Sequence, residues 1–154
     1  MGYIEELRTL IGHKRIILPG SSVIIQNKDG FILMQQRKYP HGRWSLPGGL
    51  MELGESTVET AIREIFEETG LTVGNLKLLG VYSGEGYLCS AANGDEWYVV
   101  NTAYITSDYK GTLCVNDDES IAFEWIDPNK LPNDTAKTHR IIIGDYLCTV
   151  KEKI

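Results

Sequence analysis

Residues 49–71 read GLMELGESTVETAIREIFEETGL and carry more structural information than any other segment of this chain. Ser56 and Glu59 have the spacing of a capping box, in which two side chains bond the free backbone N–H groups at a helix start. Gly70 stands where a glycine commonly ends a helix. The segment between them therefore predicts an α-helix, whose core-facing stripe is expected at Val58, Ala61, Ile62 and Ile65.

Three carboxylates share another face of this predicted helix. Glu64, Glu67 and Glu68 are spaced i, i+3 and i+4, which brings their Cβ atoms within about 5–6 Å of one another. Like charges at these spacings destabilise a helix by about 0.2–0.5 kcal/mol per pair, and a bound cation would offset that cost. No cysteine or histidine lies nearby, so these oxygen ligands favour Mg²⁺, or Mn²⁺ as a substitute, over zinc. Considered alone, the glutamates also fit a solvated acidic face.

Prolines and glycines are frequent in residues 39–54, just before the helix. This composition predicts a long ordered loop, and loops of that length in compact domains usually serve a function. Pro47-Gly48-Gly49 combines a rigid turn with backbone that can approach a ligand closely. Arg63 can reach Glu55 or Glu67 and hold a carboxylate in a fixed orientation. The surroundings of the three carboxylates therefore favour a metal or phosphate site.

Residues 49–71 resemble the Nudix box at every specified position. The pattern is a glycine (Gly49), five residues, a glutamate (Glu55), seven residues, and then Arg-Glu-aliphatic-any-Glu-Glu-any-Gly-aliphatic from Arg63 onwards. The resemblance implies the Nudix fold, of α/β (α+β) class, with a mixed β-sheet sandwiched between α-helices. It further implies that Glu64, Glu67 and Glu68 bind the metal together with the Gly48 carbonyl, supported by Glu55 and Arg63.

The implied activity is Mg²⁺-dependent hydrolysis of a diphosphate linkage in a small nucleotide. Such a reaction needs an activated water and neutralised phosphoryl oxygens, and divalent ions supply both. Arg37, at the end of a predicted strand, resembles a substrate-binding arginine of the family, and Gly48 and Gly49 are expected beside the substrate. The general base is left open among Glu67, Glu68, Glu119 and Glu85. Glu119 is included in the site because many family members take the base from a later loop.

The rest of the chain predicts further helices and strands. Apolar residues recur at helical spacing over residues 3–11, and residues 135–150 are a candidate closing helix, although the run of three isoleucines at 141–143 leaves its period ambiguous. An Asp-Gly turn signal predicts that residues 16–26 and 31–36 are two antiparallel strands. Later strands are expected at residues 76–82, 97–105 and 122–126. We expect a single domain over residues 1–154, built on one mixed sheet.

Composition limits the partners that this chain can bind. A formal net charge of −6 disfavours a grip on long nucleic acid. No apolar run approaches the roughly 20 residues that span a bilayer, and the acidic start is unlike a secretory signal, so a cytoplasmic location is expected. Three dispersed cysteines suggest buried thiols rather than disulfides. The family resemblance leaves a homodimer open.

Sequence alone does not choose the substrate. Nucleoside triphosphates, nucleotide sugars, ADP-ribose and dinucleoside polyphosphates all fit the implied reaction. A proline about 15 residues past the box would indicate ADP-ribose, but that region reads Glu85-Gly86-Tyr87, and Tyr87 lies near a tyrosine typical of dinucleoside polyphosphate hydrolases. The alternative function is a nucleotide-sensing module that keeps the fold without turnover, and the complete set of box carboxylates weighs against it.

Overall fold

The computed structural model describes residues 2–152, and its helix α2 (Thr57–Thr69) forms where the capping box predicts it. The backbone N–H of Glu59 donates to the Ser56 hydroxyl over 3.1 Å, and the N–H of Ser56 donates to the Glu59 carboxylate over 2.7 Å. Gly70 ends the helix in the left-handed conformation at φ 76°. Ala61 and Ile65 are fully buried and Ile62 packs beside them, but Val58 is exposed, so the predicted stripe is wrong at its first position.

The largest sheet has five strands and mixes parallel with antiparallel pairing. Its path runs β4-β1-β8-β6, with β7 also paired to β8. The two longest strands, β1 and β8, run parallel from the Ile16–Trp97 pair to the Ile25–Thr106 pair, while all other pairings are antiparallel. The strands are β1 (Ile16–Ile25), β4 (Gly48–Leu50), β6 (Lys77–Tyr82), β7 (Leu88–Ser90) and β8 (Glu96–Thr106).

Two smaller sheets complete the β-structure, so the single mixed sheet expected from the sequence is divided. The first has the order β10-β2-β3, and the second pairs β5 with β9. The strands are β2 (Ile32–Arg37), β3 (Trp44–Ser45), β5 (Thr72–Gly74), β9 (Asp108–Lys110) and β10 (Ser120–Ile126). Sequence analysis did not predict β3, β4, β5, β7 and β9, each of which is at most three residues long.

The predicted antiparallel pairing of the first two strands is wrong beyond one bridge, between Gln26 and Ile32. The turn at residues 27–30 forms, with the N–H of Gly30 donating to the carbonyl of Asn27 over 3.1 Å. The strands then separate into different sheets. Residues 23–25 and 32–34 are consecutive and fully buried, which means that both faces of each strand are covered. Two strands covered on both faces fit two packed layers better than one hairpin.

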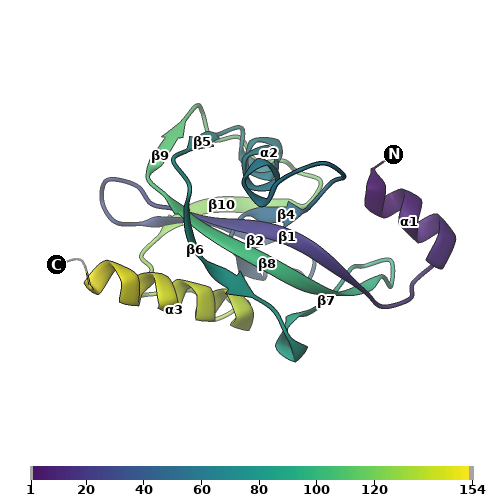
Figure 1. The fold of residues 1–154 in the computed structure, drawn as a ribbon. Helices are drawn as coiled ribbons and strands as arrows, with labels where there is room; N and C mark the ends of the chain where they lie inside the picture. Colours follow the sequence, from purple (N-terminus) through teal and green to yellow (C-terminus); the bar gives the residue numbers. More distant parts are fainter. Residues whose placement is uncertain (1, 153–154) are drawn as a thin grey trace.

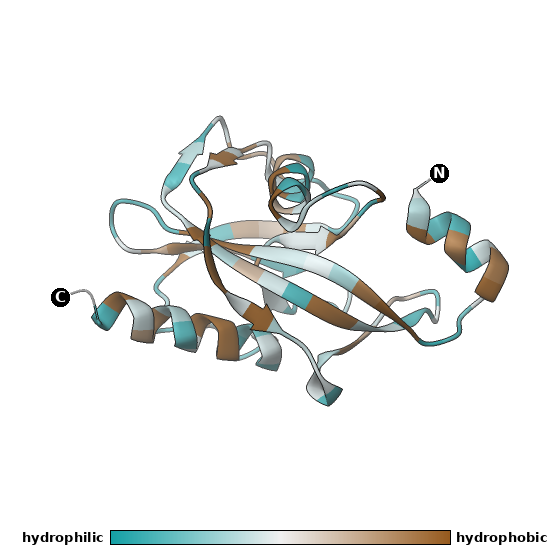
Figure 2. Ribbon diagram, in the orientation of Figure 1, coloured by the Kyte–Doolittle hydropathy of each residue, from teal (hydrophilic) through white to brown (hydrophobic). Residues whose placement is uncertain are grey.

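Helices α2 and α3 (Lys137–Lys151) lie on opposite sides of the β-structure, as Figure 1 shows, and each covers its own core. Val23 and Ile25 of β1 face the α2 core, whereas Ile24 between them faces the α3 core. Ile142 and Ile143 are buried under the sheet while Ile141 is exposed, which resolves the ambiguous isoleucine run as a helix. In Figure 2 the apolar residues, in brown, lie along the strands and in bands on α2 and α3, and also on α1. The predicted sandwich of helices around sheets is therefore confirmed.

The remaining segments lie at the periphery. A one-turn helix η1 (Glu85–Tyr87) precedes β7, and α1 (Tyr3–Ile11) lies beyond one end of the largest sheet with none of its residues buried (Figure 1). The three cysteines are free thiols, as predicted, but Cys89 is half-buried and Cys114 and Cys148 are exposed, so the prediction that they are buried is wrong. Within residues 2–152, no helix has the length and apolar character needed to cross a membrane.

Candidate functional site

A cavity of about 400 Å³ opens where α2 meets β1, β4 and β8. Glu64 and Glu68 reach it from α2, and Gly48 and Gly49 form part of its wall. Arg37, at the end of β2, and Glu119, just before β10, line the same cavity. Its volume lies in the range of roughly 300–1,000 Å³ that is common for small-molecule sites. Most of the predicted site residues are thus brought together, from segments far apart in the chain.

The two glycines of β4 leave the space that the carboxylates occupy. A Cβ atom at Gly49 would lie 2.2 Å from the carboxyl carbon of Glu64. A Cβ atom at Gly48 would lie 2.1 Å from the backbone oxygen of Ser21 on the paired strand β1, and Gly48 has φ 154°. Gly49 is therefore required by a side chain of the site, whereas Gly48 is required by the backbone of the sheet. The predicted loop at residues 39–54 is wrong here, because β3 and β4 form within it.

Glu68 is buried and Glu64 is partly buried. Glu68 is only 5% exposed, and one of its carboxylate oxygens accepts a hydrogen bond from the N–H of Gly48 over 3.1 Å. Burial, and then the nearby charge of Glu64, raise the pKa of Glu68 well above its usual value. Burial is also the main reason that the pKa of Glu64 is raised. A cation beside these two carboxylates would favour their charged forms and so offset both effects.

Arg63 forms ion pairs with three glutamates, Glu55, Glu64 and Glu67. It forms a two-pronged ion pair with Glu55, in which Nε bonds one carboxylate oxygen and Nη2 donates to the other over 3.1 Å. Nη2 also donates to the Leu50 carbonyl over 2.9 Å, and Nη1 donates to Glu64 over 2.9 Å and to Glu67 over 3.2 Å. The bond from Arg63 lowers the pKa of Glu55 to about 2. Arg63 therefore connects the loop before α2 with two carboxylates of the helix.

Glu67 lies outside the cavity, although the sequence places it with the metal ligands. Its side chain is 54% exposed, and its bond to Arg63 turns it towards the helix surface. Within residues 2–152, no group of three acidic, histidine or cysteine side chains converges closely enough to hold a metal ion. The reason is visible in the contacts, since Arg63 holds Glu64 and Glu67 while the Gly48 N–H holds Glu68. By chemistry the donors still fit a hard divalent cation, because they are carboxylate oxygens that are buried beside like charge.

Arg37 and Glu119, two predicted site residues outside residues 49–71, line the cavity, whereas Glu85 does not. The Arg37 side chain is held by a bond from Nε to the carbonyl of Tyr39 over 3.1 Å, and its positive charge lowers the pKa of Glu68 in part. Glu119 is exposed, and its negative charge contributes to the raised pKa values of Glu64 and Glu68. Glu85 is absent from the residues that line the cavity. Of the loop candidates for the base, only Glu119 is therefore near the buried carboxylates.

Several lining residues escaped the sequence analysis. The sequence analysis assigned no role to His139, but this residue lines the cavity, and its Nδ1 accepts a hydrogen bond from the N–H of Leu46 over 2.8 Å. Burial lowers the pKa of His139 to about 4. Trp97 and Asn101 of β8 also line the cavity. Only the pairing of β8 with β1 brings them there, and no local pattern in the sequence shows that pairing.

Comparisons with known proteins agree on one family. A family model described as the NUDIX domain matches residues 17–146. The chain is 37% identical to a protein of Methanocaldococcus jannaschii named ADP-ribose pyrophosphatase, over 94% of this chain and 82% of the relative. It is 31% identical to a putative 8-oxo-dGTP diphosphatase of Bacillus subtilis, over 82% of this chain and 78% of the relative. Among solved structures, a MutT NUDIX hydrolase from Burkholderia pseudomallei matches with a TM-score of 0.70 and 30% identity, covering 84% of this chain and 97% of that one.

Proposed function

Because this chain belongs to the Nudix hydrolase family, we propose that it hydrolyses the diphosphate linkage of a small nucleotide with Mg²⁺, for which Mn²⁺ can substitute. The observation that carries the proposal is the joint presence in one cavity of the buried carboxylate Glu68 and the partly buried carboxylate Glu64, with the cation Arg37 and the exposed carboxylate Glu119. Buried acidic groups beside one another are unfavourable without a cation, and an anionic substrate needs cations around it.

The metal ion would be held by Glu64 and Glu68, with Glu67 and the Gly48 carbonyl as the further ligands that the family resemblance implies. When bound, such an ion polarises the phosphoryl oxygens and lowers the pKa of water. Arg63 has a supporting role: it holds Glu64 and Glu67 in fixed orientations and is itself fixed by Glu55. Arg37 contributes a charge that stabilises the phosphoryl oxygens as negative charge develops on them.

Glu119 is the proposed general base. Water attacks one phosphorus atom, the bond from that phosphorus to the bridging oxygen breaks, and the proton of the water passes to a carboxylate. Among the described residues, the Glu119 side chain makes no hydrogen bond or ion pair, whereas Glu67 is bonded to Arg63 and Glu68 to the Gly48 N–H. A carboxylate that lines the cavity and lacks a partner is the better proton acceptor.

ADP-ribose is the first substrate to test, because the Methanocaldococcus jannaschii relative carries that name and matches 94% of this chain. Hydrolysis of its diphosphate would release AMP and ribose 5-phosphate. The second candidate is an oxidised purine nucleoside triphosphate, favoured by the name of the Bacillus subtilis relative. A nucleoside monophosphate and inorganic pyrophosphate are expected from that substrate if the α–β linkage is cut, so product analysis distinguishes the two candidates.

The test is a panel of ADP-ribose, 8-oxo-dGTP, nucleotide sugars and dinucleoside polyphosphates, each with and without Mg²⁺. We expect Mg²⁺-dependent product release from at least one of them, lost in Glu68→Gln and Glu119→Gln and kept in Glu124→Gln. Glu124 is an exposed glutamate of β10 away from the cavity, so it is a matched control for the loss of one charge. No release from any substrate would contradict the proposal, and nucleotide binding without turnover would favour the sensing module. The cytoplasmic location, the homodimer and the single domain over residues 1–154 stay predictions.

A further inference from the structure

Helix α1 is attached to the rest of the protein mainly through polar contacts. None of its residues is buried: Ile4, Leu7 and Ile11 are only partly buried, and Leu10 is 83% exposed. Figure 1 shows the helix lying between the loop that leads into α2 and the turn that joins β7 to β8. The loop before α2 contains Glu55, which pairs with Arg63, and the β7–β8 turn contains Ala91, which lines the cavity. Polar contacts at the two ends of α1 connect the helix to these two segments.

The N-terminus of α1 is hydrogen-bonded to Glu52 of the loop before α2. The backbone N–H of Tyr3, the first residue of the helix, donates to a Glu52 carboxylate oxygen over 3.0 Å. Gly2 leaves room for this approach, because a Cβ atom there would lie 2.7 Å from the other carboxylate oxygen. A carboxylate is the group that a helix N-terminus attracts, since the free N–H groups carry partial positive charge.

Glu52 also belongs to the network that orients the catalytic carboxylates. Its own backbone N–H donates to the Glu55 carboxylate over 2.9 Å, and Glu55 pairs with Arg63. Arg63 in turn holds Glu64 and Glu67. A continuous chain of bonds thus runs from the first turn of α1 to the proposed metal ligands.

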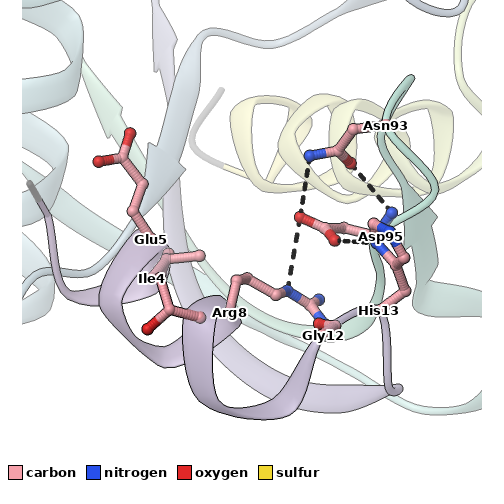
Figure 3. Close-up of a pocket in the computed structure, with 8 residues that line it drawn as sticks. Ile4, Glu5, Arg8, Gly12, His13, Asn93 and Asp95 are labelled. Atoms are coloured by element: carbon pink, nitrogen blue, oxygen red, sulfur yellow. Dashed lines mark hydrogen bonds and ion pairs between the residues drawn. The ribbon is translucent and has the colours of Figure 1, made fainter.

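The C-terminal end of α1 contacts the turn between β7 and β8 through polar side chains, as drawn in Figure 3. Arg8 is 10% exposed in its side chain; its Nη2 donates to the Glu96 carbonyl over 2.9 Å and its Nε lies 3.5 Å from the Asp95 carboxylate. His13, just past the helix, meets the other Asp95 oxygen at 2.7 Å. The turn closes through the N–H of Ala91, which donates to the Asp95 carbonyl over 2.9 Å. Ala91 and Trp97, on either side of Asp95, both line the catalytic cavity.

We propose that α1 is a positioning strap for the hydrolysis, tying the catalytic loop at Glu52 to the cavity wall at Asp95. The proposal rests on the proposed function of the cavity. Glu52 and Arg8 are then positioning residues, which act through Glu55 and through the β7–β8 turn and touch no substrate. Loss of the first contact should disturb the carboxylates and lower kcat, whereas loss of the second should disturb the wall and raise KM.

The most specific test replaces Tyr3 with proline, which has no backbone N–H to donate to the Glu52 carboxylate. Proline is favoured at the first position of a helix, and Gly2 already has the extended conformation that a residue before proline adopts, with φ −77° and ψ 168°. Tyr3→Ala is the matched control, because it loses the same side chain and keeps the N–H. Asp95→Asn tests the other end of the strap, and Glu6→Gln, on the exposed side of α1, controls for the loss of one charge.

We expect Tyr3→Pro to have a kcat about tenfold below that of Tyr3→Ala, with KM changed less than about twofold. This is the lower end of the roughly 10–100-fold cost of losing a group bonded directly to a metal ligand, because Glu52 acts through Glu55 and Arg63. Asp95→Asn should instead raise KM. Amide exchange at Glu52 and its neighbours should be faster in Tyr3→Pro than in Tyr3→Ala. Equal kcat and equal exchange in the two Tyr3 variants would overturn the strap. An inactive parent protein would contradict the proposed function instead, and the exchange comparison would still decide whether the strap exists.

Discussion

Replacing Gly49 with alanine would displace Glu64, one of the proposed metal ligands, without destabilising the fold. The added methyl group would lie 2.2 Å from the carboxyl carbon of Glu64 and 2.5 Å from both of its oxygens. Ordinary contact distances then require the carboxylate to move by about 1 Å, and misplacement of that size costs about 100-fold in catalysis. The loss corresponds to about 2.7 kcal/mol of transition-state stabilisation. The backbone of Gly49 does not have a positive φ, so alanine brings no conformational strain of its own.

The assay is steady-state hydrolysis of the best substrate at saturating Mg²⁺, with the melting temperature measured in parallel. Gly144→Ala is the control, because a Cβ atom on this exposed position of α3 meets nothing within 4 Å. That variant should keep its activity and gain roughly 1 kcal/mol in stability, since alanine is the better helix former. Gly48→Ala, in contrast, should fold poorly, because its Cβ meets backbone. Activity of Gly49→Ala within threefold of the parent would refute the reasoning about Glu64.

Three further perturbations follow from the site. Arg63→Lys should lower kcat about 10–100-fold and raise the Mg²⁺ requirement, as measured by metal titration, because lysine cannot make the two-pronged bond to Glu55; a normal metal requirement would argue against the supporting role. Glu68→Gln should abolish turnover yet raise the metal-free melting temperature at pH 7, because its raised pKa means that the buried charge opposes folding there; a lower melting temperature would contradict this. His139 has its pKa lowered to about 4, so the unfolded chain gains a proton first as pH falls, and stability should decrease from about pH 6.5 towards pH 4. Denaturant titrations of His139→Asn across that range should show a flatter decrease, and an unchanged slope would exclude His139 as its source.

The long, strongly patterned elements were predictable from the sequence. The start of α2 follows from two reciprocal bonds between neighbouring residues, Ser56 and Glu59, and such local signals survive in any tertiary context. The Nudix resemblance added the sandwich of helices around sheets. The short strands β4 and β7 were not predictable, because their pairing depends on the neighbouring strands β1 and β8 rather than on their own composition.

In the candidate site, too, contacts between residues near in sequence were predictable, whereas contacts between distant segments were not predictable from local patterns. Helical spacing brings Glu64 and Glu68 to one face of α2, and the family resemblance predicts that they bind a metal. Glu67 has the same spacing but is drawn to Arg63, which a spacing rule does not describe. His139 reaches the cavity only because α3 packs beneath the sheet, and nothing in its local sequence marks it. Arg37 and Glu119 also reach the cavity through tertiary packing, but the family resemblance indicated them, whereas neither a local pattern nor the resemblance indicated His139.

The most direct test of the account is manganese binding followed by electron paramagnetic resonance, with an ADP-ribose analogue whose bridging oxygen is replaced by a methylene group. Mn²⁺ reports on the proposed Mg²⁺ site without turnover. The account predicts bound Mn²⁺ in the parent and unchanged affinity in Glu124→Gln. In Glu64→Gln and Glu68→Gln the affinity should fall by at least the roughly 10–100-fold that loss of a ligand's supporting partner costs. No bound Mn²⁺ in the parent, or equal affinity in all four proteins, would contradict the claim that these carboxylates hold the catalytic metal.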